Sequence, residues 1–306
     1  MSTLQVKIDT VSLDNPVILA SGTCGFGREL AEYMDLSKIG GLSSKGLTLL
    51  PRQGNEGCRV AETPSGMLNC VGLQNPGVEA FLDHELAFME TTGSKIIVNV
   101  AGHSEEDYIA MVSRLNEYAN RIDALELNFS CPNVREGCMV IGTSPKAIEA
   151  LVAKLRSLTS LPLWVKLTPN VTNIRDTAKA AEAGGANAVV AINTLMGMAI
   201  DIRTRRPILH NNTGGLSGPC VKPIAIKMVH DCYEAVSIPV IGCGGISSAD
   251  DILEFMIAGA SAVEIGTWNL VHPSGAEKIV HDLEEYAKAN AIDDLSSLTG
   301  TLELWR

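Results

Sequence analysis

The chain has 306 residues, which suits one large α/β barrel domain or two domains of average size. Hydrophobic residues make up 46% and charged residues 19%, so a sizeable core can form and a disordered chain is excluded. The formal net charge of −11 argues against nucleic acid or an anionic membrane as the main partner, although an anionic small substrate stays possible.

Eight short apolar runs recur along the chain and predict buried parallel strands. They are Val17–Ala20, Gly41–Ser44, Ile96–Val100, Ala124–Asn128, Leu163–Leu167, Ala188–Ile192, Val240–Gly242 and Ala262–Ile265. Near-continuous apolar strands are typical of a sheet that is covered on both faces by helices.

A segment with helical periodicity is expected after each of these strands. Apolar residues three and four apart are clearest in Ser144–Leu158, Ile174–Ala183, Lys222–Val236 and Ala249–Ala258. Eight strand-helix units predict a single (β/α)8 barrel, or TIM barrel, that spans residues 1–306 as one domain. Two connections, 48–75 and 193–219, are long and irregular, and long loops inside a compact domain tend to be functional.

Polar residues or glycines follow the carboxyl ends of the predicted strands. In chain order they are Ser21, Lys45, Asn99, Asn128, Lys166, Asn193, Gly244 with Gly245, and Gly266 with Thr267. In a barrel these ends share one face, where active sites lie. A lysine at the end of an apolar strand is costly unless it is paired, so Lys45 and Lys166 support a shared site.

Cys131 comes just after the predicted strand 124–128, where a reactive side chain can be presented. Pro132 ends the strand because it has no N–H for the ladder. Asn128 and Asn133 flank the thiol with neutral donors and acceptors. We interpret Cys131 as a general base whose pKa is lowered by nearby positive charge. A buried structural cysteine is the alternative, and a covalent nucleophile would normally have an adjacent histidine, which the nearby sequence lacks.

Glycine-containing turns, Gly242-Cys243-Gly244-Gly245 and Gly266-Thr267, follow the last two predicted strands. This is the usual phosphate position of the barrel fold and suits a mononucleotide such as FMN. No G-x-G-x-x-G follows a strand into a helix, so no dinucleotide site is expected. Lys166 would place a cation near a flavin ring and stabilise its reduced, anionic form, or it could form a structural ion pair.

The chain carries eight cysteines and six histidines, without a C-x-x-C or H-x-x-x-H pair. We therefore expect reduced thiols, no metal site and no iron–sulfur cluster. No secretory signal opens the sequence and no apolar stretch reaches the length of a membrane span, so a cytoplasmic location is expected.

Several motifs, in one order and spacing over nearly the whole chain, resemble the dihydroorotate dehydrogenase family. They are Ser44-Lys45-Gly46-Leu47-Thr48, Pro51-Arg52, Gly66-Met67-Leu68-Asn69, Asn128-Phe129-Ser130-Cys131-Pro132-Asn133, Val165-Lys166-Leu167, Ile192-Asn193-Thr194-Leu195 and Gly214-Gly215-Leu216-Ser217-Gly218-Pro219. Cysteine at 131 resembles the soluble class 1, because the membrane-associated class has serine there. The 193–219 loop and Gly72-Leu73-Gln74-Asn75-Pro76-Gly77 are most similar to the NAD-linked class 1B catalytic subunit.

The resemblance implies specific roles. FMN would contact Ser21, Lys45, Gly46, Asn99, Asn128, Lys166, Ile192, Gly218, Gly244, Gly245, Gly266 and Thr267. Substrate would contact Lys45, Asn69, Cys70, Val71, Gly72, Leu73, Asn128, Asn193 and Thr194. Cys131 would take the C5 proton of dihydroorotate as hydride passes from C6 to FMN, which yields orotate in pyrimidine biosynthesis. Cys138 departs from the small residue, usually glycine, expected in this loop.

The resemblance also implies a partner: an electron-transfer subunit with FAD and a [2Fe–2S] cluster that passes electrons to NAD, with a homodimer of this chain inside a heterotetramer. Three alternatives stay open. The chain could work without the partner and reduce fumarate, or act on another dihydropyrimidine with the same Asn/Cys groups. From a different class, it could be a flavin-free aldolase with Lys166 as Schiff base.

Overall fold

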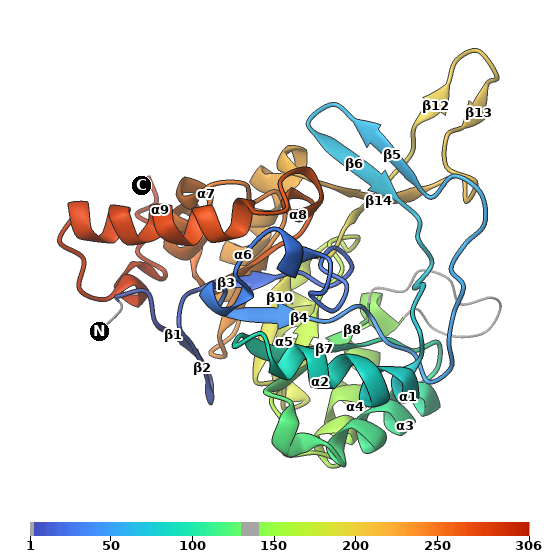
Figure 1. Ribbon diagram of the computed structural model, residues 1–306, viewed down its shortest axis with the longest axis horizontal. Helices are drawn as coiled ribbons and strands as arrows, with labels where there is room; N and C mark the ends of the chain where they lie inside the picture. The colour runs from blue at the N-terminus through green and yellow to red at the C-terminus, as the bar shows by residue number, and fades with distance from the viewer. Residues whose placement is uncertain (1–2, 130–140, 306) are drawn as a thin grey trace.

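The computed structural model describes residues 3–129 and 141–305 (Figure 1). The described chain opens with an antiparallel hairpin, β1 (Val6–Ile8) and β2 (Val11–Leu13), which packs against a strand near the other end of the chain. Alternate residues of this hairpin are buried, as the two-residue period of a half-covered strand requires.

A closed barrel of parallel strands follows and confirms the fold class predicted from the apolar runs. The strands are β3 (Val17–Leu19), β4 (Gly41–Ser43), β7 (Lys95–Val100), β8 (Ala124–Asn128), β9 (Leu163–Lys166), β10 (Ala188–Ala191), β15 (Val240–Cys243) and β16 (Ala260–Ile265). They neighbour one another in the order β10-β15-β16-β3-β4-β7-β8-β9. Each predicted strand corresponds to one of these: Ala124–Asn128 has its predicted bounds, and the others differ by one or two residues. That residues 1–306 form one FMN-binding domain stays a prediction.

Helices lie around the barrel (Figure 1). The α-helices are α1 (Val78–Ala80), α2 (Leu86–Glu90), α3 (Glu105–Asn116), α4 (Pro145–Arg156), α5 (Ile174–Ala183), α6 (Lys222–Tyr233), α7 (Ala249–Ala258), α8 (Trp268–Val271) and α9 (Gly275–Ala289), with a π turn, η3 (Phe81–Glu85), between α1 and α2. Ser104, Ser144 and Ser248 cap α3, α4 and α7, because each hydroxyl accepts a hydrogen bond from a backbone N–H of the first turn. The other single turns are η1 (Leu30–Glu32), η2 (Leu36–Lys38), η4 (Ala119–Arg121), η5 (Ile141–Thr143), η6 (Pro219–Val221) and η7 (Leu295–Leu298).

The expectation of a helix after every strand is wrong for the first connection. Between β3 and β4 the chain forms only the 3-10 turns η1 and η2. Gly25 and Gly27 have φ of 57° and 94°, values that an α-helix cannot accommodate.

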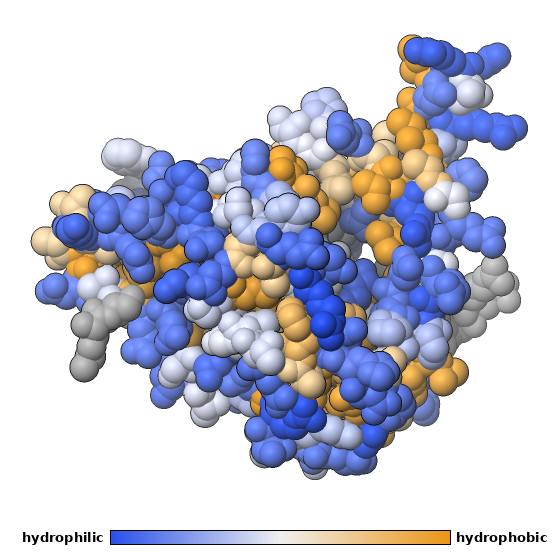
Figure 2. Space-filling model, in the orientation of Figure 1, coloured by the Kyte–Doolittle hydropathy of each residue, from blue (hydrophilic) through white to orange (hydrophobic). Residues whose placement is uncertain are grey.

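The two irregular connections form one antiparallel sheet, the mouth sheet, which lies beyond the carboxyl ends of the barrel strands (Figure 1). Its strands are β5 (Val60–Thr63), β6 (Gly66–Asn69), β11 (Leu195–Gly197) and β14 (Gly214–Ser217), in the order β11-β14-β6-β5. A further hairpin, β12 (Ile200–Asp201) with β13 (Arg206–Pro207), projects from it. Figure 2 shows apolar side chains along this projection, where Ile202 is 87% exposed.

Asn15 holds the start of the barrel together. Its buried Oδ1 accepts hydrogen bonds from Val17 N (3.1 Å) and Gly40 N (3.2 Å), and its Nδ2 donates to Lys38 O (2.8 Å). The side chain therefore links the beginnings of β3 and β4, which are neighbours in the barrel.

We expect Asn15→Ala to lower the free energy of unfolding by about 2–4 kcal/mol, because three hydrogen bonds of a buried amide are lost together. Equilibrium denaturation in urea measures the change. Asn211→Ala, at an exposed position, is the matched control and should stay within about 0.5 kcal/mol of the native protein. Equal stability of the two variants would contradict the assigned role of Asn15.

Candidate active site

The predicted site residues come together at the carboxyl ends of the barrel strands, here called the barrel mouth. Lys45 and Gly46 follow β4, Asn99 lies in β7, Asn128 ends β8 and Lys166 ends β9. The others follow β3, β10, β15 and β16: Ser21, Ile192, Gly244, Gly245, Gly266 and Thr267. Gly218 and the expected substrate residues Asn69 and Thr194 come from the mouth sheet and its flanks. One rim therefore carries groups from the whole length of the chain.

A buried polar layer of Asn99, Glu126, Lys166 and Glu264 lies inside the barrel just below the mouth. Lys166 Nζ lies 3.4 Å from Glu126 Oε1 and also forms an ion pair with Glu264 Oε2. Asn99 Nδ2 donates to Glu126 Oε1. Both glutamate side chains are fully buried. The structural ion pair considered for Lys166 is thus present, and the lysine still lies at the base of the mouth.

The charges within this layer set its protonation. Burial alone would lower the pKa of Lys166, but the negative charges of Glu126 and Glu264 raise it well above the usual value. Burial and the charge of Glu126 raise the pKa of Glu264 well above its usual value. For Glu126, burial is outweighed by Lys166 and by hydrogen bonds, so its pKa is lowered. Lys166 is accordingly cationic at neutral pH.

Neither glutamate was assigned a role from the sequence. The signal was present, because Glu126 lies in the apolar run Leu125-Glu126-Leu127 and Glu264 in Val263-Glu264-Ile265. A charged residue in the middle of a buried strand needs a partner, and the strand period places Glu126 on the same side as Asn128.

Lys45 differs from Lys166 because no acidic side chain in the described part of the chain forms an ion pair with it. It is half-buried, and its backbone N–H donates to Gly25 O (2.8 Å). Burial lowers the pKa of Lys45, while Cys24 and Arg59 have smaller effects that oppose each other. A half-buried cation without an acidic partner is suited to bind an anionic group of a ligand.

Glycine turns at Gly218 and Gly245 bring two backbone segments close together at another part of the mouth. Gly218 and Gly245 have φ of 98° and 80°, and a Cβ added to Gly245 would lie 2.8 Å from both Gly218 O and Lys222 N. Thr267 Oγ1 donates to Ser217 Oγ (2.8 Å) next to them. These turns meet the start of α6, a place where backbone N–H groups bind phosphate. An added Cβ on Gly266 would make only ordinary contacts, so packing within the protein does not require this glycine.

Asparagines line the side of the mouth that faces the mouth sheet. Asn193 Nδ2 donates to Asn128 Oδ1 (3.3 Å), and Asn193 Oδ1 accepts from Thr194 N (2.7 Å). Asn69 Nδ2 donates to Gly215 O across paired strands (3.3 Å). Hydrogen bonds therefore link the expected substrate residues Asn128, Asn193 and Thr194, and Asn69 is held on the mouth sheet beside them.

The segment Cys70–Leu73 lies over Gly46 and is fixed by Asn75. Asn75 Nδ2 donates to Leu73 O (2.7 Å) and Thr48 Oγ1 (2.8 Å), while its Oδ1 accepts from Gly77 N (2.9 Å). A Cβ added to Gly46 would lie 2.9 Å from Asn99 Oδ1 and 3.3 Å from Leu73 Cδ2. The expected substrate segment thus lies beside the expected cofactor residues.

Cys131 and Cys138 lie outside the described residues, so the role of Cys131 stays a prediction. The strand end before it is well anchored: Tyr108 OH donates to Asn128 O (2.6 Å), and the rings of Tyr108 and Phe129 meet edge to face at 5.3 Å. Cys24 and Cys243 also lie near the mouth, but burial raises the pKa of each to about 12. Neither thiol can act as a base at neutral pH.

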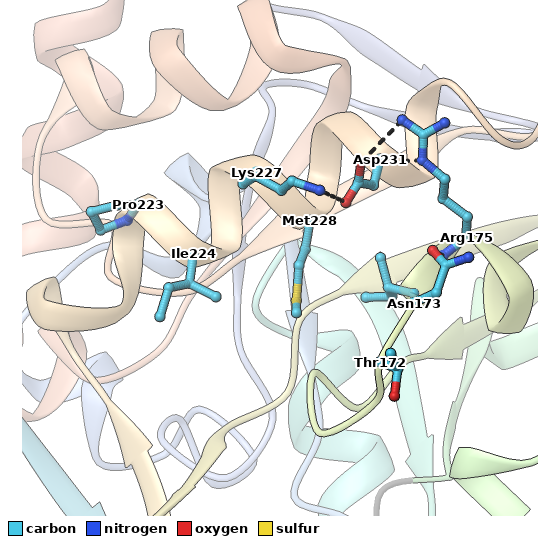
Figure 3. A pocket seen from close by; sticks show the side chains of 9 residues that line it. Thr172, Asn173, Arg175, Pro223, Ile224, Lys227, Met228 and Asp231 are labelled. Atoms are coloured by element: carbon cyan, nitrogen blue, oxygen red, sulfur yellow. Dashed lines mark hydrogen bonds and ion pairs between the residues drawn. The ribbon is translucent and has the colours of Figure 1, made fainter.

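An open recess of about 630 Å³ lies between α6 and the start of α5 (Figure 3). Asp231 is held there between Lys227 and Arg175, with Arg175 Nη2 at 3.0 Å (Figure 3). Asp231 is therefore paired with both basic side chains. None of the residues predicted for the active site lines this recess.

The family model described as dihydroorotate dehydrogenase matches residues 3–286 of the chain. The chain belongs to the dihydroorotate dehydrogenase family. A protein of Geotalea uraniireducens (strain Rf4) is 48% identical over 299 residues, which cover 98% of each chain. A protein of Thermoanaerobacter pseudethanolicus (strain ATCC 33223 / 39E) is 49% identical over 301 residues, 98% of this chain and 99% of the relative. Both relatives are named dihydroorotate dehydrogenase B (NAD(+)), catalytic subunit. The resemblance to the NAD-linked branch of the family is confirmed.

A solved structure shows the same fold at low sequence identity. It is a crystal structure of DHODH in complex with ferulenol from Eimeria tenella. It is 21% identical, covers 98% of this chain and 89% of its own chain, and has a TM-score of 0.77. This likeness supports the barrel architecture alone.

The described residues of this family member contain no cluster of three or more His, Cys, Asp or Glu side chains that could hold a metal ion. Within the same ranges, every helix is too short or too polar to span a bilayer.

Proposed function

We propose that this chain is the catalytic subunit of an NAD-linked dihydroorotate dehydrogenase, which oxidises dihydroorotate to orotate in pyrimidine biosynthesis. The observation that carries the proposal is Lys45, a half-buried cation at the barrel mouth without an acidic partner among the described residues. Dihydroorotate is a ring with amide edges and one carboxylate. The names of relatives about half identical over nearly the full chain support the same activity.

FMN fits the chemistry of the mouth. Gly218, Gly245 and the start of α6 supply close backbone N–H groups for its phosphate. Toward the ring lies Asn99, whose buried Oδ1 has no hydrogen-bond donor among the described residues and can accept one from a ring N–H. Lys166 supplies a fixed cation below the ring. When bound, FMN provides the acceptor for the hydride from C6 of the substrate.

The substrate would lie between Lys45 and the asparagines at positions 69, 128 and 193. Lys45 binds the carboxylate, and the neutral amides bind the ring edges without adding charge. The segment Cys70–Leu73 covers this space from above and excludes water from it. The C5 proton passes to Cys131, placed by the sequence directly after the anchored end of β8.

The partner, assembly and location follow the same proposal. Electrons leave this chain for a second subunit with FAD and a [2Fe–2S] cluster, which reduces NAD. Two copies of the chain form a dimer within a heterotetramer, since obligate assemblies are usually symmetric. We place the complex in the cytoplasm.

The Schiff-base aldolase is the least favoured alternative. A Schiff base needs a neutral, accessible amine. Lys166 is only 5% exposed and contacts two carboxyl groups, whose charges raise its pKa against the opposing effect of burial. The fumarate-linked and dihydropyrimidine alternatives share the flavin site, and they are separated by the experiments below.

Lys45→Met keeps the apolar stem and removes the charge. We expect orotate binding to weaken roughly 10- to 150-fold, because a charge-assisted hydrogen bond of about 1.5–3 kcal/mol is lost. Titration of the flavin spectrum with orotate measures it, and turnover of dihydroorotate against dihydrouracil gives the substrate class. Lys38→Met, at an exposed lysine, is the control. Unchanged orotate affinity in the Lys45→Met variant with flavin bound would refute the carboxylate assignment.

Cys131→Ala should lower the rate of dihydroorotate oxidation roughly 10²- to 10⁴-fold while FMN stays bound, because the general base is lost. Cys131→Ser should retain little activity at neutral pH, since a hydroxyl is a weaker base than a thiolate. Stopped-flow reduction of the flavin by dihydroorotate isolates this step. Cys138→Ala is the matched control from the same segment and should react at near the native rate. The reverse pattern would transfer the role of base to Cys138.

The chain purified alone should oxidise dihydroorotate with an artificial dye but not with NAD, because the described residues and the sequence offer no second redox centre. Addition of the electron-transfer subunit should restore NAD reduction. Full NAD reduction by the lone chain would overturn the partner assignment. Fast turnover with fumarate would instead identify the partner-free type of soluble enzyme.

A further inference from the structure

Two carboxyl groups share one ammonium group inside the closed barrel. Lys166 on β9 contacts Glu126 on β8 and Glu264 on β16, and both glutamates are fully buried. Each glutamate also has one buried oxygen, Glu126 Oε2 and Glu264 Oε1, that no donor of the described residues reaches. Two carboxyl groups that contact the same ammonium group can hydrogen-bond to each other only when one of them carries a proton.

Charge balance leads to the same result. If both glutamates were ionised, the group would bury a net charge of −1, because Lys166 supplies the only positive charge that these acids contact in the described ranges. An uncompensated charge in a closed barrel is expensive, and two adjacent carboxylates do not both ionise. With one proton, the group has one ammonium, one carboxylate and one carboxylic acid, and is neutral.

The surroundings decide which acid carries the proton. Glu126 Oε1 accepts from Asn99 Nδ2 and from Lys166, which favours the carboxylate at this position. Glu264 Oε2 also contacts Lys166, but no amide of the described residues donates to Glu264, and its other neighbours include the thiols of Cys24 and Cys243. Both thiols are neutral, because burial raises their pKa to about 12. Glu126 Oε2 and Glu264 Oε1 both lack a donor in the described part of the chain, so the extra donor of Asn99 to Glu126 Oε1 is what distinguishes the two acids and leaves the proton on Glu264.

We propose that Glu126 and Glu264 share a single proton and together position the Lys166 ammonium below the flavin ring. The flavin part rests on the proposed function, whereas the shared proton rests on the barrel interior alone. Both glutamates are positioning residues that act through Lys166. Together the two glutamates compensate the charge of Lys166. Negative charge that is added on the mouth side of Lys166 favours the protonated form of the glutamate pair.

The shared proton gives stability a specific pH dependence. Because the folded pKa of Glu264 is raised above its unfolded value, its contribution to stability is complete below the unfolded pKa and is lost as pH rises toward the folded pKa. The lowered pKa of Glu126 acts in the opposite sense, but its loss occurs only in acid. Glu264→Gln, a neutral mimic of the protonated acid, should therefore gain unfolding temperature relative to the native protein as pH rises from 5 to 9.

Infrared difference spectroscopy tests the proton directly. The FMN-loaded native protein should show the carbonyl band of a protonated carboxylic acid at neutral pH, and Glu264→Gln should lose it. Glu126→Gln should lose it as well, because Glu264 is then the one remaining carboxylate of the described residues that contacts Lys166. The matched control is Asp231→Asn, a buried carboxylate paired with two cations, which should keep the band. A native protein without the band, or a band that survives both glutamate substitutions, overturns the shared proton.

The flavin potential tests the positioning role. Between pH 6 and 9, the potential of the native protein should depend on pH more steeply than that of Glu264→Gln, and Asp231→Asn should match the native slope. If the flavin potentials of the native protein and of Glu264→Gln changed equally with pH, the pair would be a structural ion cluster only, and the positioning role would be overturned. Failure to bind FMN would refute the proposed function instead, while the infrared and stability results would still decide the shared proton.

Discussion

Closure of the parallel barrel is the constraint on which the rest of the structure depends. Because every strand runs in the same direction, closure brings all eight carboxyl ends to one rim. The interior just below that rim is dry, so any charge placed there must be balanced within a few ångströms. For Lys166, the balancing negative charge comes from Glu126 and Glu264. Lys45 follows β4 at the barrel mouth without an acidic partner among the described residues, so its charge is available to a ligand. One geometrical requirement therefore sets the place of the site and its charge pattern.

Much of the fold could be predicted from the sequence because a strand buried on both faces has a strong signature. Runs such as Ile96–Val100 and Ala188–Ile192 contain apolar residues at successive positions, and α5 and α7 were predicted with their observed bounds. The mouth sheet could not be predicted. Its strands are short and half-exposed, and β14 contains two glycines, so neither periodicity nor propensity marks them. β5 and β6 form a local hairpin, but the sheet is completed only when β14 pairs with β6 from far along the chain.

The site was predictable to the extent that its residues follow strand ends. Lys45, Asn128 and Lys166 were found by that rule, and the resemblance to a known family added Gly218 and the 69–73 segment. Glu126 and Glu264 were not identified, since their importance depends on which strands are neighbours around the barrel. Strands β8 and β16 are far apart in sequence, and only closure brings their side chains to the same lysine. Long-range pairing of this kind leaves no local pattern in a single sequence.

The pairing of β6 with β14 also has a consequence for the order in which the molecule folds. Asn69 and Gly215 are hydrogen-bonded although 146 residues separate them. The entropic cost of closing so long a loop is reduced only when the barrel strands between them have already assembled. A chain emerging from the ribosome can thus form the first half of the barrel early, but not the mouth sheet. The mouth sheet is therefore among the last parts of the fold to be completed.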